Sequence, residues 1–260
     1  MPPAETPSSP KTSPPPDDTP TAAVLVIGDE VLSGRVKDTN IGTIADYLAL
    51  LGIDLDEARI VPDRQDRIVE ALNALRARNT YVFTTGGIGP THDDITADAV
   101  AAAFGVPIDH HPDAVAMLRE RYQGDDLNAA RLRMARIPEG ASLVPNPITK
   151  APGFRIGNVI VMAGVPAIMR AMLDAVGPTL ARGVVPDLRQ IEAPLKEGDV
   201  AGPLAALDKR HAGVLIGSYP RFDGERYAVL ITLRGRDTGL LDAAESDVRD
   251  LLQSLEDPRR

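Results

Sequence analysis

The stretch TTGGIGPTHDDIT, residues 84–96, places three glycines and a proline directly before two aspartates. A short apolar run, residues 80–85, leads into it and is typical of a buried strand. A helical pattern follows over residues 94–104 and ends before a glycine. A strand that passes through a glycine loop into a helix is the repeating unit of parallel α/β folds, so this stretch predicts the fold class.

The same strand–helix order recurs on both sides of the glycine loop. We expect strands over residues 21–28, 53–61 and 158–164, helices over residues 40–51 and 167–180, and a helix capped by Asp66 with Ile68, Val69, Leu72 and Leu75 on its buried face. Repeated units of this kind predict a mostly parallel sheet that is covered by helices on both faces. Ligands on such sheets bind beyond the carboxyl ends of the strands, where the glycine loop would lie.

Composition and pattern divide the chain into three parts. Residues 1–20 are rich in Pro and Ser and predict a disordered tail, while residues 21–182 carry the strand–helix units. Residues 183–260 change to a β-α-β-β-α pattern, which predicts a small α+β domain. The favoured pair Asp223-Gly224 would turn its hairpin, and a final helix is expected over residues 239–255.

The totals exclude several classes of function. The 260 residues include no Cys, which rules out disulfides, thiolate zinc sites and cysteine nucleophiles. A net charge of −9 argues against a nucleic-acid partner, which requires a basic surface. No apolar run is long enough to cross a membrane and no signal peptide is evident, so we expect a cytoplasmic protein without a membrane partner.

The glycine loop combines features of a phosphate site and of a metal site. Gly86, Gly87 and Gly89 allow a ligand to approach the backbone closely, and the following helix would direct free N–H groups toward it. The adjacent Asp93 and Asp94 would repel a phosphate unless a cation lay between them. The sequence therefore predicts a metal-bridged phosphate. The alternative is a plain strand–helix turn in which one aspartate is the helix N-cap.

Two further loops would bring acidic side chains to the same edge. Asp29 and Glu30 follow the first strand, with Ser33 close behind, and Asp63 follows the second strand. Each loop alone is typical of a turn, but together they place carboxylates at three consecutive strand ends. Lys150, in a later loop, is a candidate phosphate contact.

Four segments in this order resemble a known family. GDEVLSG, TTGGIGPTHDD, NPITKAPGF and AGVP resemble the MoaB/Mog-type molybdopterin-binding domain, and most closely the N-terminal part of competence/damage-inducible protein A (CinA) in a short form without its C-terminal amidase domain. The resemblance covers about residues 21–180. It implies a three-layer α/β/α domain that binds a nucleotide or pterin pyrophosphate, and a homo-oligomer, either a dimer or a trimer.

The resemblance also assigns roles to particular residues. Asp94 matches the family's metal-associated aspartate and Asp63 the aspartate of its I-P-D element. Both are candidate metal ligands, and with Asp29 they are the candidate catalytic residues. The candidate ligand-binding residues are Gly28, Glu30, Ser33, Gly34, Gly86, Gly87, Gly89, Pro90, Thr91, Asp93, Asn146, Lys150, Pro152, Gly153, Gly164 and Pro166.

Three functions follow from these assignments. The leading one is a metal-dependent nucleotide pyrophosphatase of the ADP-ribose type, with Mg²⁺ or Co²⁺ as its divalent cation. A second is adenylyl transfer to molybdopterin, in which a pterin phosphate replaces water as the nucleophile. A third is a module that binds a nucleotide or pterin without turnover. Lys150 and Ile168, in place of the family's usual Thr and Glu, favour the third function, whereas the presence of Asp63, Asp93 and Asp94 opposes it.

Overall fold

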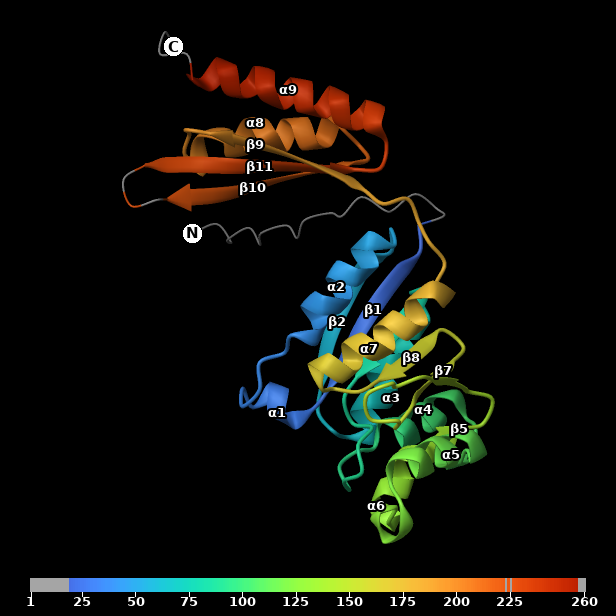
Figure 1. Cartoon of the computed structure of the whole chain (residues 1–260). Coiled ribbons are helices and arrows are strands. Elements are labelled where there is room, and N and C mark those ends of the chain that lie inside the picture. The colour runs from blue at the N-terminus through green and yellow to red at the C-terminus, as the bar shows by residue number, and fades with distance from the viewer. Residues whose placement is uncertain (1–18, 223, 225, 257–260) are drawn as a thin grey trace, which may run out of the picture. The chain divides into compact units, whose positions relative to one another are not determined.

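A computed structural model describes residues 19–222, 224 and 226–256 (Figure 1). The described chain divides into two compact units, one over Pro20–Gly183 and one that begins at Val184. All but the last two residues of the predicted tail, residues 1–20, lie outside the described part. Within the described part, no helix is both long enough and apolar enough to span a membrane.

The Pro20–Gly183 unit is built on a six-stranded sheet of order β2-β1-β3-β8-β7-β6. Four neighbouring strands are parallel, which confirms the predicted mostly parallel sheet. Two more strands extend the sheet in antiparallel fashion, and the sequence did not predict them. The strands are β1 (Thr21–Ile27), β2 (Asp54–Val61), β3 (Tyr81–Thr85), β6 (Ser142–Val144), β7 (Gly153–Ile156) and β8 (Val159–Met162).

Helices cover both faces of this sheet because its central strands are apolar on both sides (Figure 1). On β1, Leu25 packs with α3, α4 and α5, whereas Val24 packs with α2 and α7. The three-layer α/β/α arrangement is the predicted one. The helices are α2 (Asn40–Leu50), α3 (Gln65–Arg76), α4 (Thr96–Phe104), α5 (Pro112–Arg121) and α7 (Pro166–Val176).

Short elements complete this unit. A two-stranded antiparallel ribbon pairs β4 with β5, and a single turn of helix follows β1. These elements are α1 (Asp29–Leu32), β4 (Ile108–His110), η1 (Gly124–Asp126), α6 (Ala129–Leu132), η2 (Arg133–Ala135), β5 (Arg136–Pro138) and η3 (Gly177–Thr179).

Two expected helix starts are wrong. Asp66 does not cap α3: it lies in the first turn, where its carboxylate pairs with Arg64 at 2.8 Å. The helix after the glycine loop begins at Thr96 rather than at Asp94. Asp94 is not its cap, because its Oδ2 turns back to accept a hydrogen bond from the Thr91 N–H at 2.8 Å.

The second unit confirms the predicted β-α-β-β-α order (Figure 1). Its three antiparallel strands lie in the order β10-β11-β9. Ile231 and Leu233 of β11 pack with Leu204 of α8 and Val248 of α9. The elements are β9 (Asp187–Ala193), α8 (Glu197–Arg210), β10 (Val214–Phe222), β11 (Tyr227–Gly235) and α9 (Thr238–Glu256). Asp223 of the predicted turn lies outside the described residues.

Candidate functional site

The loops that leave the parallel strands meet at one edge of the sheet, because parallel strands have their carboxyl ends on the same side. Two backbone hydrogen bonds tie neighbouring loops together there. The Gly28 N–H donates to the Val61 carbonyl at 3.1 Å, and the Gly86 N–H donates to the Met162 carbonyl at 3.3 Å. The predicted site segments after β1, β2, β3 and β8 are therefore neighbours.

Carboxylates on the loops after β1 and β3 lie near enough to Asp63 to act on its pKa. The Asp29 N–H donates a 2.8 Å hydrogen bond to Oδ2 of Asp63. Burial raises the pKa of Asp63, and the negative charges of Glu30, Asp29 and Asp93 raise it further, while the bond from the Asp29 N–H opposes them. This edge of the sheet therefore carries a local excess of negative charge.

The two aspartates of the glycine loop have different surroundings. Hydrogen bonds from the Thr91 side chain and from its own backbone lower the pKa of Asp93, and the charge of His92 adds to them. Asp94 accepts a bond from the Thr91 N–H, and it competes with Asp93 for the single proton of the Thr91 hydroxyl. Asp94 is not among the groups that shift the pKa of Asp63. Among the described residues there is no cluster of three or more His, Asp or Glu side chains arranged to hold a metal ion.

Glycine is required at two positions of the loop. At Gly86 the backbone has φ +100°, and a Cβ atom there would lie 2.1 Å from the Ile27 carbonyl oxygen. At Gly87 the backbone has φ +65°, and a Cβ atom there would lie 2.2 Å from Oγ1 of Thr96. Positive φ and close contact together mean that a side chain at either position would strain or displace the loop.

The loop also carries backbone donors that the protein does not use. Within the described residues, the N–H groups of Gly87, Ile88 and Gly89 donate to no protein acceptor. Adjacent N–H groups in a glycine-rich turn are typical of anion-binding sites. This part of the site can therefore interact with negatively charged oxygens, as the sequence predicts.

The loop after β8 packs directly against the glycine loop. A Cβ atom at Gly164 would lie 3.1 Å from the Cα of Gly86. The Gly164 carbonyl accepts a 2.8 Å hydrogen bond from Nδ2 of Asn40, a buried side chain whose Oδ1 has no partner in the described structure. Pro166 occupies the first turn of α7. Asn40 was missed at the sequence level, where a single Asn at a helix start carries no specific signal.

The predicted residues of the 146–153 loop mainly hold the loop itself. Asn146 donates to the Ala151 carbonyl at 2.9 Å and accepts bonds from the Ile148 and Thr149 N–H groups. Lys150 pairs with Glu120 at 3.1 Å rather than being free. Gly153 allows close packing, since a Cβ atom there would lie 2.1 Å from the Val161 carbonyl oxygen.

The remaining predicted residues shape the first loop. Ser33 donates its hydroxyl to the Glu30 carbonyl at 3.2 Å, and Gly34 has φ +74°. A Cβ atom at Gly28 would lie 2.5 Å from the Glu30 carboxylate. The absence of a side chain at Gly28 thus leaves room for the Glu30 carboxylate, and the Ser33 hydroxyl holds the Glu30 backbone.

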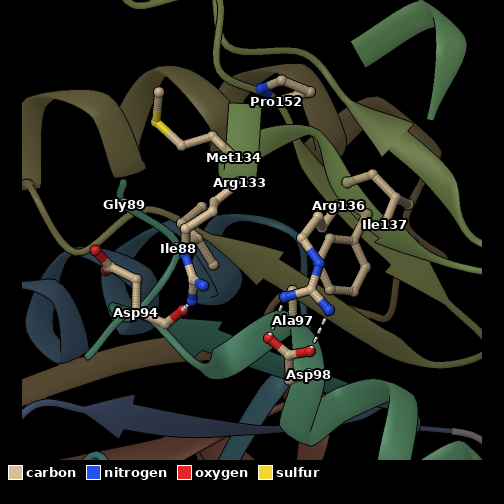
Figure 2. A pocket seen from close by; sticks show the side chains of 12 residues that line it. Ile88, Gly89, Asp94, Ala97, Asp98, Arg133, Met134, Arg136, Ile137 and Pro152 are labelled. Atoms are coloured by element: carbon tan, nitrogen blue, oxygen red, sulfur yellow. Dashed lines mark hydrogen bonds and ion pairs between the residues drawn. The ribbon is translucent and has the colours of Figure 1, made fainter. Parts of the chain in front are cut away.

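A pocket adjoins the glycine loop, and Figure 2 shows the residues that line it. Gly87, Gly89 and Asp94 belong to the loop, and Pro152 comes from the 146–153 segment. The other lining residues are Ile88, Ala97, Asp98, Arg133, Met134, Arg136, Ile137 and Phe154. The sequence did not predict the two arginines as site residues, because they lie some forty residues beyond the loop and belong to no motif that we identified.

Comparison with known proteins identifies the family. A model of the probable molybdopterin binding domain matches residues 23–182, and a model of the FAD synthase middle domain matches residues 188–256. A protein of Pyrobaculum calidifontis is 34% identical over 213 residues, which cover 78% of this chain and 81% of that protein. A CinA-like protein of Citrifermentans bemidjiense is 44% identical over 159 residues, 58% of this chain but only 38% of the CinA-like protein.

A solved structure agrees with these matches. The crystal structure of the protein CinA from Thermoplasma acidophilum, described as of unknown function, superposes with a TM-score of 0.59 at 34% identity. The match covers 62% of this chain and 98% of that chain. The chain therefore belongs to the family of the probable molybdopterin binding domain, with a MoaB/Mog-like fold and CinA-like proteins among its relatives.

Proposed function

We propose that the Pro20–Gly183 unit is a metal-dependent pyrophosphatase that cleaves a nucleotide diphosphate of the ADP-ribose type. One observation supports this above all others: a loop of unused backbone N–H groups lies beside a group of carboxylates from three strand ends. The first feature suits phosphate oxygens and the second suits a cation. A diphosphate bound together with a metal ion is the ligand that uses both.

The carboxylates fit a divalent cation in chemistry and in charge. They offer hard oxygen donors, which Mg²⁺ prefers, and burial first, then the negative charges of Glu30, Asp29 and Asp93, raise the pKa of Asp63. We propose that Asp63 and the Asp93-Asp94 pair hold Mg²⁺ or Co²⁺. When bound, such an ion neutralises the diphosphate and increases the acidity of a bound water.

The protein's own residues have separate roles in this proposal. The N–H groups of Gly87, Ile88 and Gly89 bind non-bridging oxygens as negative charge develops on them. The Asp29 N–H fixes the orientation of the Asp63 carboxylate. Asp29 or Glu30 accepts a hydrogen bond from the attacking water or from the ribose. Thr91 holds Asp94 in place.

The test is AMP release from ADP-ribose by the purified chain with Mg²⁺, with Co²⁺ and with EDTA. We expect metal-dependent release that is lost in Asp63→Asn and in Asp94→Asn. Asp125→Asn is the matched control, because Asp125 is an exposed aspartate of η1, outside the site. No release by the wild-type chain with either metal would refute the proposal for this substrate.

A binding module without turnover is the second candidate. It is favoured by the lack, among the described residues, of a cluster already arranged to hold a metal. Under this function a nucleotide or a pterin phosphate would bind the glycine loop, and no AMP would appear. Calorimetric binding of ADP-ribose without AMP release would support it. Pyrophosphate released from ATP only when molybdopterin is added would instead indicate adenylyl transfer, in which the AMP group moves to the pterin phosphate.

A further inference from the structure

Arg133 is a cation that lines the pocket without an acidic partner. It belongs to η2, and no ion pair to it is found among the described residues. Its Nε is buried and has no hydrogen-bond partner. Its Nη2 approaches the Asp94 carbonyl at 3.4 Å, which is long for a hydrogen bond (Figure 2). A buried guanidinium donor without a partner is costly, so this arrangement calls for an acceptor.

Arg136, which lines the same pocket, has the acidic partner that Arg133 lacks among the described residues. Arg136 makes two bonds to the Asp98 carboxylate, of 2.8 and 2.6 Å (Figure 2). That bidentate pair satisfies both charges and links β5 to α4. Arg133 has no comparable partner, although the chain carries a net charge of −9 and is rich in carboxylates.

The acidic groups of the pocket leave Arg133 available. Asp98 is neutralised by Arg136, and Oδ2 of Asp94 accepts a bond from the Thr91 N–H. The rest of the lining is backbone of Gly87 and Gly89 or apolar side chains such as Met134 and Pro152. The hydrogen-bond donors that remain free in this pocket are thus the Arg133 guanidinium and the backbone N–H groups of the glycine loop.

We propose that Arg133 binds a phosphate oxygen of the nucleotide and is a specificity-determining residue for the charged part of the ligand. The inference rests on the proposed nucleotide diphosphate ligand. A guanidinium offers several N–H donors in one plane, which match the oxygens of a phosphate better than those of a base or a sugar. Bound there, the phosphate would accept hydrogen bonds from the terminal N–H groups of the guanidinium and lie next to the N–H groups of the glycine loop.

The experiment compares the affinities of two probes by calorimetry in the presence of Mg²⁺. The charged probe is α,β-methylene-ADP, a diphosphate whose bridging carbon prevents hydrolysis, and the uncharged probe is adenosine. The variants are Arg133→Gln, the conservative Arg133→Lys, and Arg131→Gln as a matched control. Arg131 is two residues away, stacks on the Tyr122 ring at 4.6 Å and does not line the pocket.

We expect Arg133→Gln to weaken binding of α,β-methylene-ADP by about tenfold to about 100-fold and to leave adenosine binding unchanged. Arg133→Lys should recover part of the loss, and Arg131→Gln should match the wild type. Thermal unfolding of each variant checks that the unit still folds. Equal losses for both probes would indicate a structural role and overturn the inference.

The inference and the proposed function can fail separately. Binding of the charged probe that depends on Arg133, in a chain that releases no AMP from ADP-ribose, would support the inference and refute the pyrophosphatase. AMP release with the same kcat and KM in Arg133→Gln as in the wild type would support the pyrophosphatase and overturn the inference. A wild-type chain that does not bind α,β-methylene-ADP would overturn the inference.

Discussion

The Asp29 N–H and the Asp63 carboxylate, 34 residues apart in sequence, form a 2.8 Å hydrogen bond that joins the loops after β1 and β2. The bond orients Asp63 and favours its charged form, while burial and three neighbouring carboxylates disfavour that form. Asp63 thus remains in a negatively charged environment that a cation would relieve.

Asp63→Asn should abolish stabilisation by metal ions. If Mg²⁺ binds the wild-type chain, a concentration about 100-fold above its Kd adds about 2.7 kcal/mol to the free energy of unfolding. The variant lacks a proposed ligand, so we expect its metal affinity and its AMP release to fall by at least about 100-fold. The shift in Tm on adding Mg²⁺, compared between the variant and the wild type, measures the stabilisation by the metal. Equal shifts in both proteins would argue against Asp63 as a ligand.

The same variant should change how stability depends on pH. An aspartate whose pKa is raised in the folded state binds its proton more tightly there than in the unfolded chain. The associated stability is therefore present at low pH and is lost as the pH rises through the raised pKa. In EDTA, the Tm of Asp63→Asn minus that of the wild type should increase as the pH rises above about 3.9, the ordinary pKa of Asp. A difference in Tm that stays constant as the pH rises would contradict a raised pKa.

Gly86→Ala should destabilise the Pro20–Gly183 unit. The positive φ alone costs about 1–3 kcal/mol for a residue with a side chain, and the clash with the Ile27 carbonyl adds to it. Gly42→Ala is the matched control: Gly42 lies in α2 with open space around it, so alanine should stabilise the protein by up to about 1 kcal/mol. Urea denaturation measures the free energy of unfolding of both variants. Similar free energies of unfolding for the two variants would refute the geometric argument.

The Asp98–Arg136 pair should contribute to stability rather than to ligand binding. Each side chain is only about a quarter exposed, at 29% and 26%, and the pair is bidentate. Asp98→Asn should lower the free energy of unfolding by about 1.5–3 kcal/mol. A double-mutant cycle with Arg136→Gln measured by urea denaturation should give a coupling of at least about 0.5 kcal/mol. Additive losses would show that the two charges act independently.

Much of the fold could be predicted from the sequence because strand and helix periods are local properties. Apolar runs such as residues 21–27 and the helical face of Ile44 and Leu48 depend on nearby residues alone. The antiparallel strands β6 and β7 are three and four residues long, too short to show a period. The expected helix start at Asp94 was wrong because a local turn, in which Asp94 accepts a hydrogen bond from the Thr91 N–H, precedes the helix.

The order of the strands predicts which loops lie at this edge of the sheet, but not which side chains line the pocket beside them. The parallel topology brings Asp29, Asp63 and Asp93 to one edge, as the order of strands implied. Arg133 reaches the loop only through the path of the chain after α5, which no local pattern encodes. Its position can be seen only when residues distant in sequence are placed together.

The close approach of Gly164 to Gly86 has a consequence for motion. The Gly86 amide is bonded to the Met162 carbonyl just before Gly164, so the ends of β3 and β8 must separate before that amide proton can exchange with solvent. The native-state hydrogen-exchange rate of this one amide therefore distinguishes two cases. Either the ends of β3 and β8 separate in a local opening, or they separate only when the whole unit unfolds.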